Sequence, residues 1–235
     1  EEEKEELQEE VAQETGRQYY RIDILLGMLK YYRAELFLHR EIEKKAGTLA
    51  AAYTVYKSNQ LLYNQYLEAM EDISRALDNM PQTASARLEI KLLLNRAQCY
   101  RRLGFYQEAY EDYFSAEKKA ESYQYNDLRW QVYGHTADFL TIHGPEVAPE
   151  NYRKKAEEYY TRSLLVVEDM PLRYTSKRGK VLGFYNGYID LLLSGKKWQT
   201  AFNFAERKTS FNRIILIGSE SPDLYDAAHD RMYRQ

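Results

Sequence analysis

Residues 97–109, with the sequence AQCYRRLGFYQEA, decide the fold of this chain. Small and aromatic side chains stand on both sides of Gly104 at spacings of three and four, which is typical of two amphipathic helices packed together. We expect Gly104 to take the left-handed conformation that ends the first helix. Ala97 and Ala109 leave room for the helices to approach closely, because a bulkier residue at either position would overpack the contact. The stretch therefore predicts a helix hairpin.

The rest of the chain continues this pattern. Leu, Ala, Tyr, Glu and Lys recur at helical spacings, and no run of β-branched residues alternates with period two. Only five Pro and eleven Gly interrupt the 235 residues, and those between apolar segments predict turns. The predicted turns lie at Pro81, Gly104, residues 144–149, Pro171 and Gly195. The sequence thus predicts an all-α protein.

A unit of 34 residues, from Ile90 to Tyr123, carries the sharpest pattern. Small residues stand where the two helices touch, aromatic residues fill the gaps beside them, and a glycine lies in the turn. The residues concerned are Leu93, Ala97, Tyr100, Gly104, Tyr106, Ala109, Tyr113 and Ala116. The unit resembles the tetratricopeptide repeat. This resemblance implies a right-handed α-solenoid of stacked antiparallel helix pairs.

Three further units fit the template with departures. A unit from Ala50 matches well in its second helix only. A unit around Trp130 fits when an extended loop is inserted at residues 143–151, and the last unit, from Leu182, has Gly195 one position early. We therefore expect about four repeats in one elongated domain.

The first ten residues hold seven Glu and one Lys, a charge of about −6, so the remaining residues are slightly basic. The chain has no initiator Met and ends in helix-compatible sequence, and we expect it to be a piece of a longer protein. The predicted segments are an acidic helix start or tail at 1–10, capping helices at 11–46, the repeat array at 47–217, and a C-terminal helix at 218–235 leading into a missing region.

Composition excludes several classes of partner. With 44% hydrophobic and 29% charged residues and a net charge of −3, the chain can form a core but is not basic enough for nucleic acid to be its main partner. We expect no membrane partner, because no apolar run reaches the length of a bilayer and the acidic N-terminus is unlike a secretory signal. The lone Cys99 cannot form an intramolecular disulfide, which favours the cytoplasm.

No motif for catalysis, for a cofactor or for a metal is visible, and we expect the chain not to be an enzyme. Cys99 stands in the middle of a helix, where a small buried residue belongs. His135 and His143 are better interpreted as groove or loop residues than as metal ligands, since two histidines without further donors make a poor site. The carboxylate pairs Glu111–Asp112 and Glu157–Glu158 are expected on solvated helix faces.

The functional surface of a solenoid of this type is its concave face, made chiefly by the first helix of each repeat. Repeat offsets predict a polar, mildly basic groove in which side-chain amides bind a peptide backbone and Arg102 binds a carboxylate. The predicted partner-binding residues are Lys91, Asn95, Gln98, Arg102, Gln131, His135, Asn186 and Asp190. The alternative is that these are ordinary exposed helix residues. Most of the 23 tyrosines are expected to fill packing positions, with Tyr63, Tyr123 and Tyr125 as exposed recognition residues.

A second resemblance lies in the last unit. Ala205, Glu206 and Arg207 are similar to a segment of the final repeat that precedes a caspase-like CHAT peptidase domain, whereas Phe211 and Ile214 depart from that pattern. The resemblance implies a sensor module whose catalytic His and Cys lie beyond residue 235.

The leading hypothesis is a non-catalytic scaffold or regulatory sensor that binds a protein or peptide segment in its concave groove. The alternatives are the regulatory part of such a cysteine peptidase and a receptor for a small signalling peptide. The sequence leaves the partner and the oligomeric state open.

The repeat register predicts that Tyr113 is fully buried. Tyr113→Ala should then lower the free energy of unfolding by about 3–5 kcal/mol, measured by denaturant titration. A loss below about 0.5 kcal/mol, the size expected for a surface residue, would mean that the register is wrong.

Overall fold

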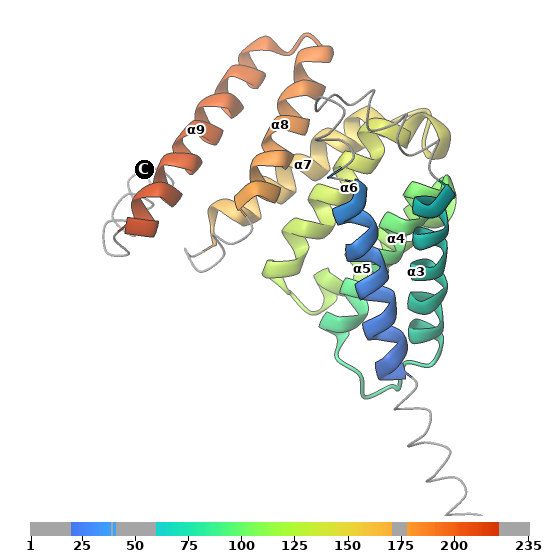
Figure 1. Ribbon diagram of the computed structural model, residues 1–235. Helices are drawn as coiled ribbons and strands as arrows, with labels where there is room; N and C mark the ends of the chain where they lie inside the picture. Colours follow the sequence, from blue (N-terminus) through green and yellow to red (C-terminus); the bar gives the residue numbers. More distant parts are fainter. Residues whose placement is uncertain (1–19, 39, 41–59, 171–177, 221–235) are drawn as a thin grey trace, which may run out of the picture. The chain divides into compact units, whose positions relative to one another are not determined.

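The computed structural model describes residues 20–38, 40, 60–170 and 178–220, and all of its regular secondary structure in these ranges is helical (Figure 1). The all-α prediction is confirmed there. A first described helix covers residues 20–38. It is followed by α3 (Gln60–Asp78), α4 (Ala86–Leu103), α5 (Tyr106–Ser122), α6 (Asn126–Val147), α7 (Tyr152–Glu168), α8 (Arg178–Ser194) and α9 (Trp198–Glu220). The acidic segment 1–10, the first helix of the unit from Ala50, the Pro171 turn and residues 221–235 lie outside the described ranges. The array boundary predicted at residue 217 falls within α9.

The hairpin of α4 and α5 forms as residues 97–109 predict. Gly104 has φ 89° and ψ 8°, and the Phe105 amide donates to the Tyr100 carbonyl at 2.9 Å, so the left-handed glycine ends α4. Ala97, Ala109 and Tyr113 are completely buried. The small residues bring the backbones together and the aromatic ring fills the space beside them.

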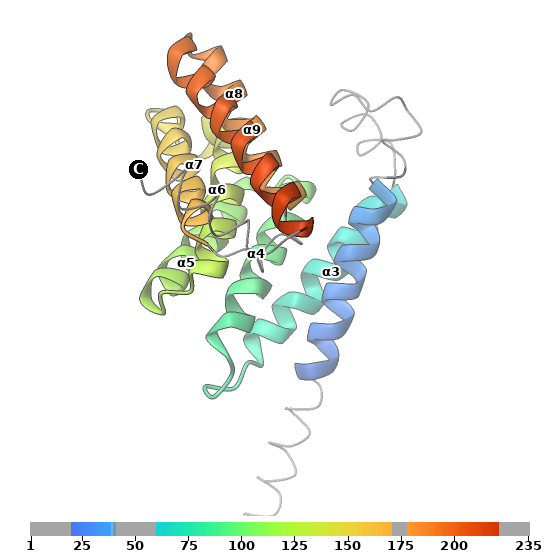
Figure 2. The ribbon, with the colours of Figure 1, turned by 90° about the vertical axis from the view of Figure 1, so that its left-hand side faces the viewer.

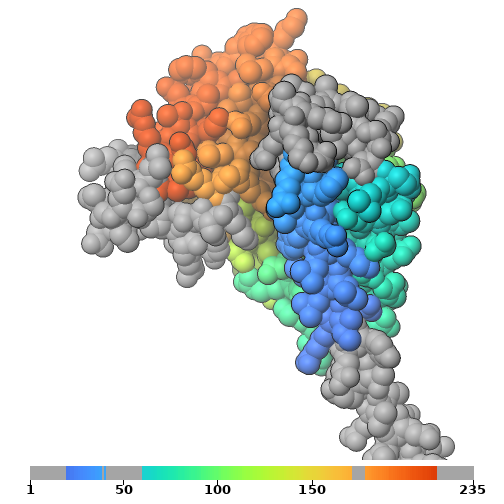
Figure 3. Space-filling model, viewed as in Figure 1, coloured from blue at the N-terminus to red at the C-terminus, as the bar shows by residue number. Residues whose placement is uncertain are grey.

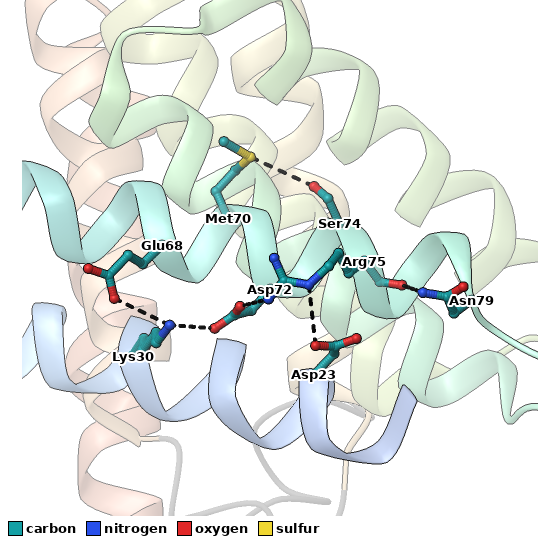
Figure 4. A network of polar contacts seen from close by, with 8 residues as sticks. All are labelled: Asp23, Lys30, Glu68, Met70, Asp72, Ser74, Arg75 and Asn79. Atoms are coloured by element: carbon teal, nitrogen blue, oxygen red, sulfur yellow. Dashed lines mark hydrogen bonds and ion pairs between the residues drawn. The ribbon is translucent and has the colours of Figure 1, made fainter. Parts of the chain in front are cut away.

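The chain divides into two compact units, residues 1–119 and 120–235. In the first unit, the helix of residues 20–38 runs antiparallel to α3, because Asp23, Lys30 and Glu35 contact Arg75, Asp72 and Tyr66 in reverse order. Figure 4 shows the contacts of Asp23 and Lys30 with α3, in which Lys30 lies 3.2 Å from Glu68 and 2.8 Å from Asp72. The second helix of the unit predicted from Ala50 is therefore α3, and its described neighbours are the helix of residues 20–38 and α4.

In the second unit, α6 pairs with α7 and α8 pairs with α9 as successive hairpins, and α7 packs on α8 (Figures 1 and 2). Helices α6 and α8 also touch, because Gly134 lets them approach closely: a Cβ on Gly134 would lie 2.1 Å from the ring of Phe184. The same ring packs edge-on against Trp130 at 5.9 Å between ring centroids. The second unit thus repeats the arrangement in which a small residue on one helix receives an aromatic residue of another.

The extended loop predicted at residues 143–151 is wrong. Helix α6 continues to Val147 with Pro145 inside it, and only a short turn precedes α7. Gly144 is buried against Tyr152, and its carbonyl accepts the Ala148 amide at 2.8 Å, so the last turn of α6 is closed. Proline near a helix end removes one backbone hydrogen bond without ending the helix, and tertiary packing outweighs that cost here.

The turns between helices differ in the residue that takes a positive φ. Gly104 does so before α5, but Gln124 (φ 51°) and Lys196 (φ 59°) do so before α6 and α9. In the last turn Gly195 lies one position before the residue with a positive φ, as its sequence position indicated. Lys196 therefore takes the left-handed conformation that L-residues avoid.

We expect Lys196→Gly to raise the free energy of unfolding by about 0.5–1 kcal/mol and Gly104→Ala to lower it by about 1 kcal/mol, because only glycine adopts a positive φ without strain. A Cβ on Gly104 would meet nothing within 4 Å, so the cost lies in the backbone alone. Gly183→Ala in the interior of α8, also in open space, is the matched control and should instead stabilise. Urea unfolding measures all three, and a stabilising Gly104→Ala would contradict the assignment.

Candidate functional site

The predicted groove residues of α4 differ in their surroundings. Lys91 is exposed and Asn95 half-buried, whereas Gln98 is only 5% exposed. Arg102 binds Glu35 of the helix at residues 20–38, through Nε at 3.2 Å and Nη2 at 3.4 Å. Lys91 and Asn95 are therefore the α4 side chains best placed to meet a partner, and Arg102 already has a carboxylate within the first unit.

The predicted residues of α6 and α8 lie on two helices that touch. Gln131 is buried and donates through Nε2 to the Asp127 carbonyl at 2.7 Å. His135 is half-buried and meets the ring of Phe184 edge-on at 5.3 Å. Asn186 and Asp190 are exposed on α8. In the second unit, His135, Asn186 and Asp190 are thus the candidates that solvent reaches.

The outward face of α8 has an unusual composition. Gly179, Gly183, Asn186 and Asp190 are all exposed and follow one another at spacings of four, three and four, which places them along one side of the helix. A Cβ on either glycine would meet nothing within 4 Å. This side of α8 therefore presents bare backbone followed by an amide and a carboxylate.

A contact that sequence analysis missed recurs in the molecule: a glutamate held by a tyrosine hydroxyl and an arginine, each from a different helix. In the first unit the Tyr66 hydroxyl donates to Glu35 Oε1 at 2.6 Å, and Arg102 completes the contact. We call this group a Glu-Tyr-Arg triad. In chain order, its members come from the helix of residues 20–38, from α3 and from α4.

Two triads of the same order lie in the second unit. Tyr133 of α6 donates to Glu121 of α5 at 2.8 Å, and Arg162 of α7 contacts both. Tyr185 of α8 donates to Glu168 of α7 at 2.8 Å, and Arg207 of α9 binds the other oxygen of that carboxylate. Glu168 is buried whereas Glu121 is exposed, so solvent screens the first of these triads more strongly. Each triad links three of the described helices, and Arg207 has this structural role in the second unit.

Electrostatics oppose acid–base chemistry at the triad of the first unit. Burial by itself would raise the pKa of Glu35, but the charge of Arg102 and the hydrogen bonds from Tyr66 and Arg102 outweigh it and hold the pKa below its usual value. Burial, followed by the charge of Glu35, raises the pKa of Tyr66. The carboxylate stays ionised and the phenol stays protonated near neutral pH, which suits a structural contact.

Asp112 corrects the expectation that the Glu111–Asp112 pair is merely solvated. Asp112 is buried and accepts two hydrogen bonds from Arg96, from Nε and Nη2, both at 2.8 Å. Such a bidentate pair satisfies the buried carboxylate and the half-buried guanidinium at once. This pair has no local signature in the sequence, because Arg96 and Asp112 lie on different helices.

A cleft of about 540 Å³ lies in the second unit, where the end of α7 faces α9. Its lining residues are Leu165, Glu168, Asp169, Asn203, Glu206, Arg207 and Ser210. Glu168 and Arg207 in its wall bind each other, and the other charged residues of its lining are both acidic, Asp169 and Glu206.

Cys99 is buried, and burial raises the pKa of its thiol, which disfavours the nucleophilic thiolate. In the described part of the chain, no group of three or more His, Cys, Asp and Glu side chains is arranged to hold a metal ion. None of the described helices combines the length and the apolar character that crossing a bilayer requires. Of the tyrosines expected at the surface, Tyr123 is exposed and stacks on Tyr125 at 5.5 Å, and Tyr63 is half-buried.

No family model and no curated protein matches the sequence. A search of solved structures finds BtubC (BKLC) from P. vanneervenii, with a TM-score of 0.49 and 18% identity, over 80% of this chain and 72% of that one. Similarity at this level does not bear on function.

The triad of the first unit predicts a pH dependence. Because the pKa of Glu35 is lower in the folded state, its contribution to stability is present above the unfolded-state pKa of about 4.3 and is lost as the pH falls through the folded-state value. Glu35→Gln should lower the free energy of unfolding by about 1–3 kcal/mol at neutral pH, and by progressively less on acidification below about pH 4. Urea titrations across this range measure the difference, with the exposed Glu158→Gln as control. A cost that did not change with pH would contradict the assignment.

Proposed function

We propose that this chain is a non-catalytic interaction module, a right-handed solenoid of the tetratricopeptide type that binds a peptide or protein segment and serves as a scaffold or sensor. Successive antiparallel helix pairs, with alanine or glycine at their close contacts, support this architecture. The buried thiol of the lone Cys99 is compatible with the cytoplasm.

The observation that carries the proposal is the outward side of α8. An asparagine amide can donate to and accept from a peptide backbone, and an aspartate accepts from N–H groups or binds a basic side chain. Asn186 and Asp190 are exposed and one turn apart, and the bare backbone at Gly183 gives a ligand close access. We assign these two residues to the partner-binding surface, with His135 of the adjoining α6.

On α4, Lys91 and Asn95 are proposed as contacts, whereas Gln98 and Arg102 are proposed to act structurally. Gln98 is buried, and replacing Arg102 would leave Glu35 without its cation. A loss of binding in an Arg102 variant would therefore not distinguish recognition from folding.

Peptides that bind the full chain can be selected from a random displayed library and their affinities measured by fluorescence anisotropy. The double variant Asn186→Ala/Asp190→Ala should bind them about tenfold more weakly, as expected for the loss of about 1.4 kcal/mol of polar contacts, with no fall in melting temperature. The control is Lys154→Ala/Glu158→Ala, which removes two exposed side chains with the same spacing from α7. Undiminished affinity in the α8 variant would exclude this surface.

A further inference from the structure

The helix of residues 20–38 has two apolar faces, and only one is covered. Tyr20, Ile24, Ala34 and Leu38 are buried in the core of the first unit. A second row of six apolar residues is exposed, from 42% for Leu26 to 65% for Leu29. These residues are Ile22, Leu25, Leu26, Leu29, Tyr32 and Leu36. Figure 3 shows this helix, in blue, at the surface beside α3. So many large apolar side chains on one exposed face indicate an interaction site.

The spacing of this row indicates what kind of surface covers it. Ile22, Leu25, Leu29, Tyr32 and Leu36 alternate at intervals of three and four, which is the a and d pattern of a coiled coil. We call these five residues the heptad seam. A seam of this narrow type is covered by one facing helix, whose side chains pack between its own.

Among the described residues of this helix, the exposed charges on the side of the heptad seam are all positive. Arg21, Arg33 and Arg40 are exposed on this side of the helix. The acidic residues of the helix are engaged elsewhere, since Asp23 binds Arg75 and Glu35 binds Tyr66 and Arg102. Arg33 and Arg40 follow Leu26 at intervals of seven, so they flank the seam at the positions that select a partner helix by charge.

We propose that the heptad seam docks an amphipathic helix of another protein that has leucines at its a and d positions and glutamates beside them. A second copy of this chain fits less well, because the exposed charges that flank the seam would be basic on both copies, and the acidic residues of the helix, Asp23 and Glu35, are already bound within the first unit. This surface belongs to the first unit, and the inference is independent of the α8 surface proposed above.

The test uses the full chain and a fluorescent synthetic heptad peptide with Leu at a and d and Glu at e and g, which repels itself and so stays available for binding. The matched peptide has Lys in place of each Glu. Anisotropy should give a dissociation constant in the micromolar range for the acidic peptide, on the order of 10 µM, and binding at least about tenfold weaker for the basic one.

Three variants locate the contact. Leu25→Ser/Leu29→Ser should weaken binding of the acidic peptide at least about tenfold without changing the circular dichroism spectrum, because both side chains are exposed. Arg33→Glu should weaken binding of the acidic peptide and strengthen binding of the basic one. Leu61→Ser, at a similarly exposed leucine of α3, is the control and should change neither.

The proposal is overturned if the wild-type chain fails to bind the acidic peptide, binds both peptides equally, or keeps its affinity in the double variant. It is also overturned if light scattering shows a dimer that the double variant dissociates, which would make a second copy the occupant. Binding to phosphatidylserine-containing vesicles that the double variant abolishes, without peptide binding, would assign the seam to a membrane surface instead.

Discussion

The fold depends on a carboxylate shared between a tyrosine hydroxyl and a guanidinium from three successive helices. Each hairpin could slide or rotate against the next if only apolar contacts joined them, because such contacts have little directionality. A Glu-Tyr-Arg triad fixes both the position of the helices along their axes and their rotation, since Tyr66 and Arg102 must reach the same carboxyl group of Glu35. Because the pKa of Glu35 is lowered, this carboxyl group stays charged near neutral pH. The same arrangement at Glu168 gives the second unit an equivalent constraint.

This constraint separates the polar residues that hold the helices from those available to a partner. Arg102 is predicted from the sequence to bind a partner's carboxylate, yet it binds Glu35 inside its own unit, and Arg207 binds Glu168 in the same way. Besides the contacts proposed on α4 and α6, two chemically different surfaces stay accessible in the described part of the chain. One is the polar outward side of α8, and the other is the apolar heptad seam flanked by arginines. The scaffold role proposed above would use both surfaces, because surfaces of different chemistry engage different partners.

Sequence reasoning succeeded where the cause is local. Gly104 ends α4 because only glycine takes its conformation easily, and Ala97, Ala109 and Tyr113 are buried because helical periodicity fixes the side on which they lie. It failed at residues 143–151, where Pro145 indicated a loop. Packing of Gly144 on Tyr152 keeps that segment helical, and a contact between two different helices leaves no local signature. It also missed the burial of Asp112, whose partner Arg96 lies on another helix.

The sequence by itself determined the helical class, the turn at Gly104 and the small and aromatic positions at which the helices pack, because spacings of three and four and the φ of one glycine are properties of the chain alone. Only the tertiary structure decided which charges are satisfied internally and which apolar row is left uncovered. Ile24 and Leu25 are neighbours in sequence and equally apolar, but one lies in the core and the other at the surface. The difference arises because α3 and α4 supply a core for one face of the helix, and periodicity cannot say which of two apolar faces a partner will cover.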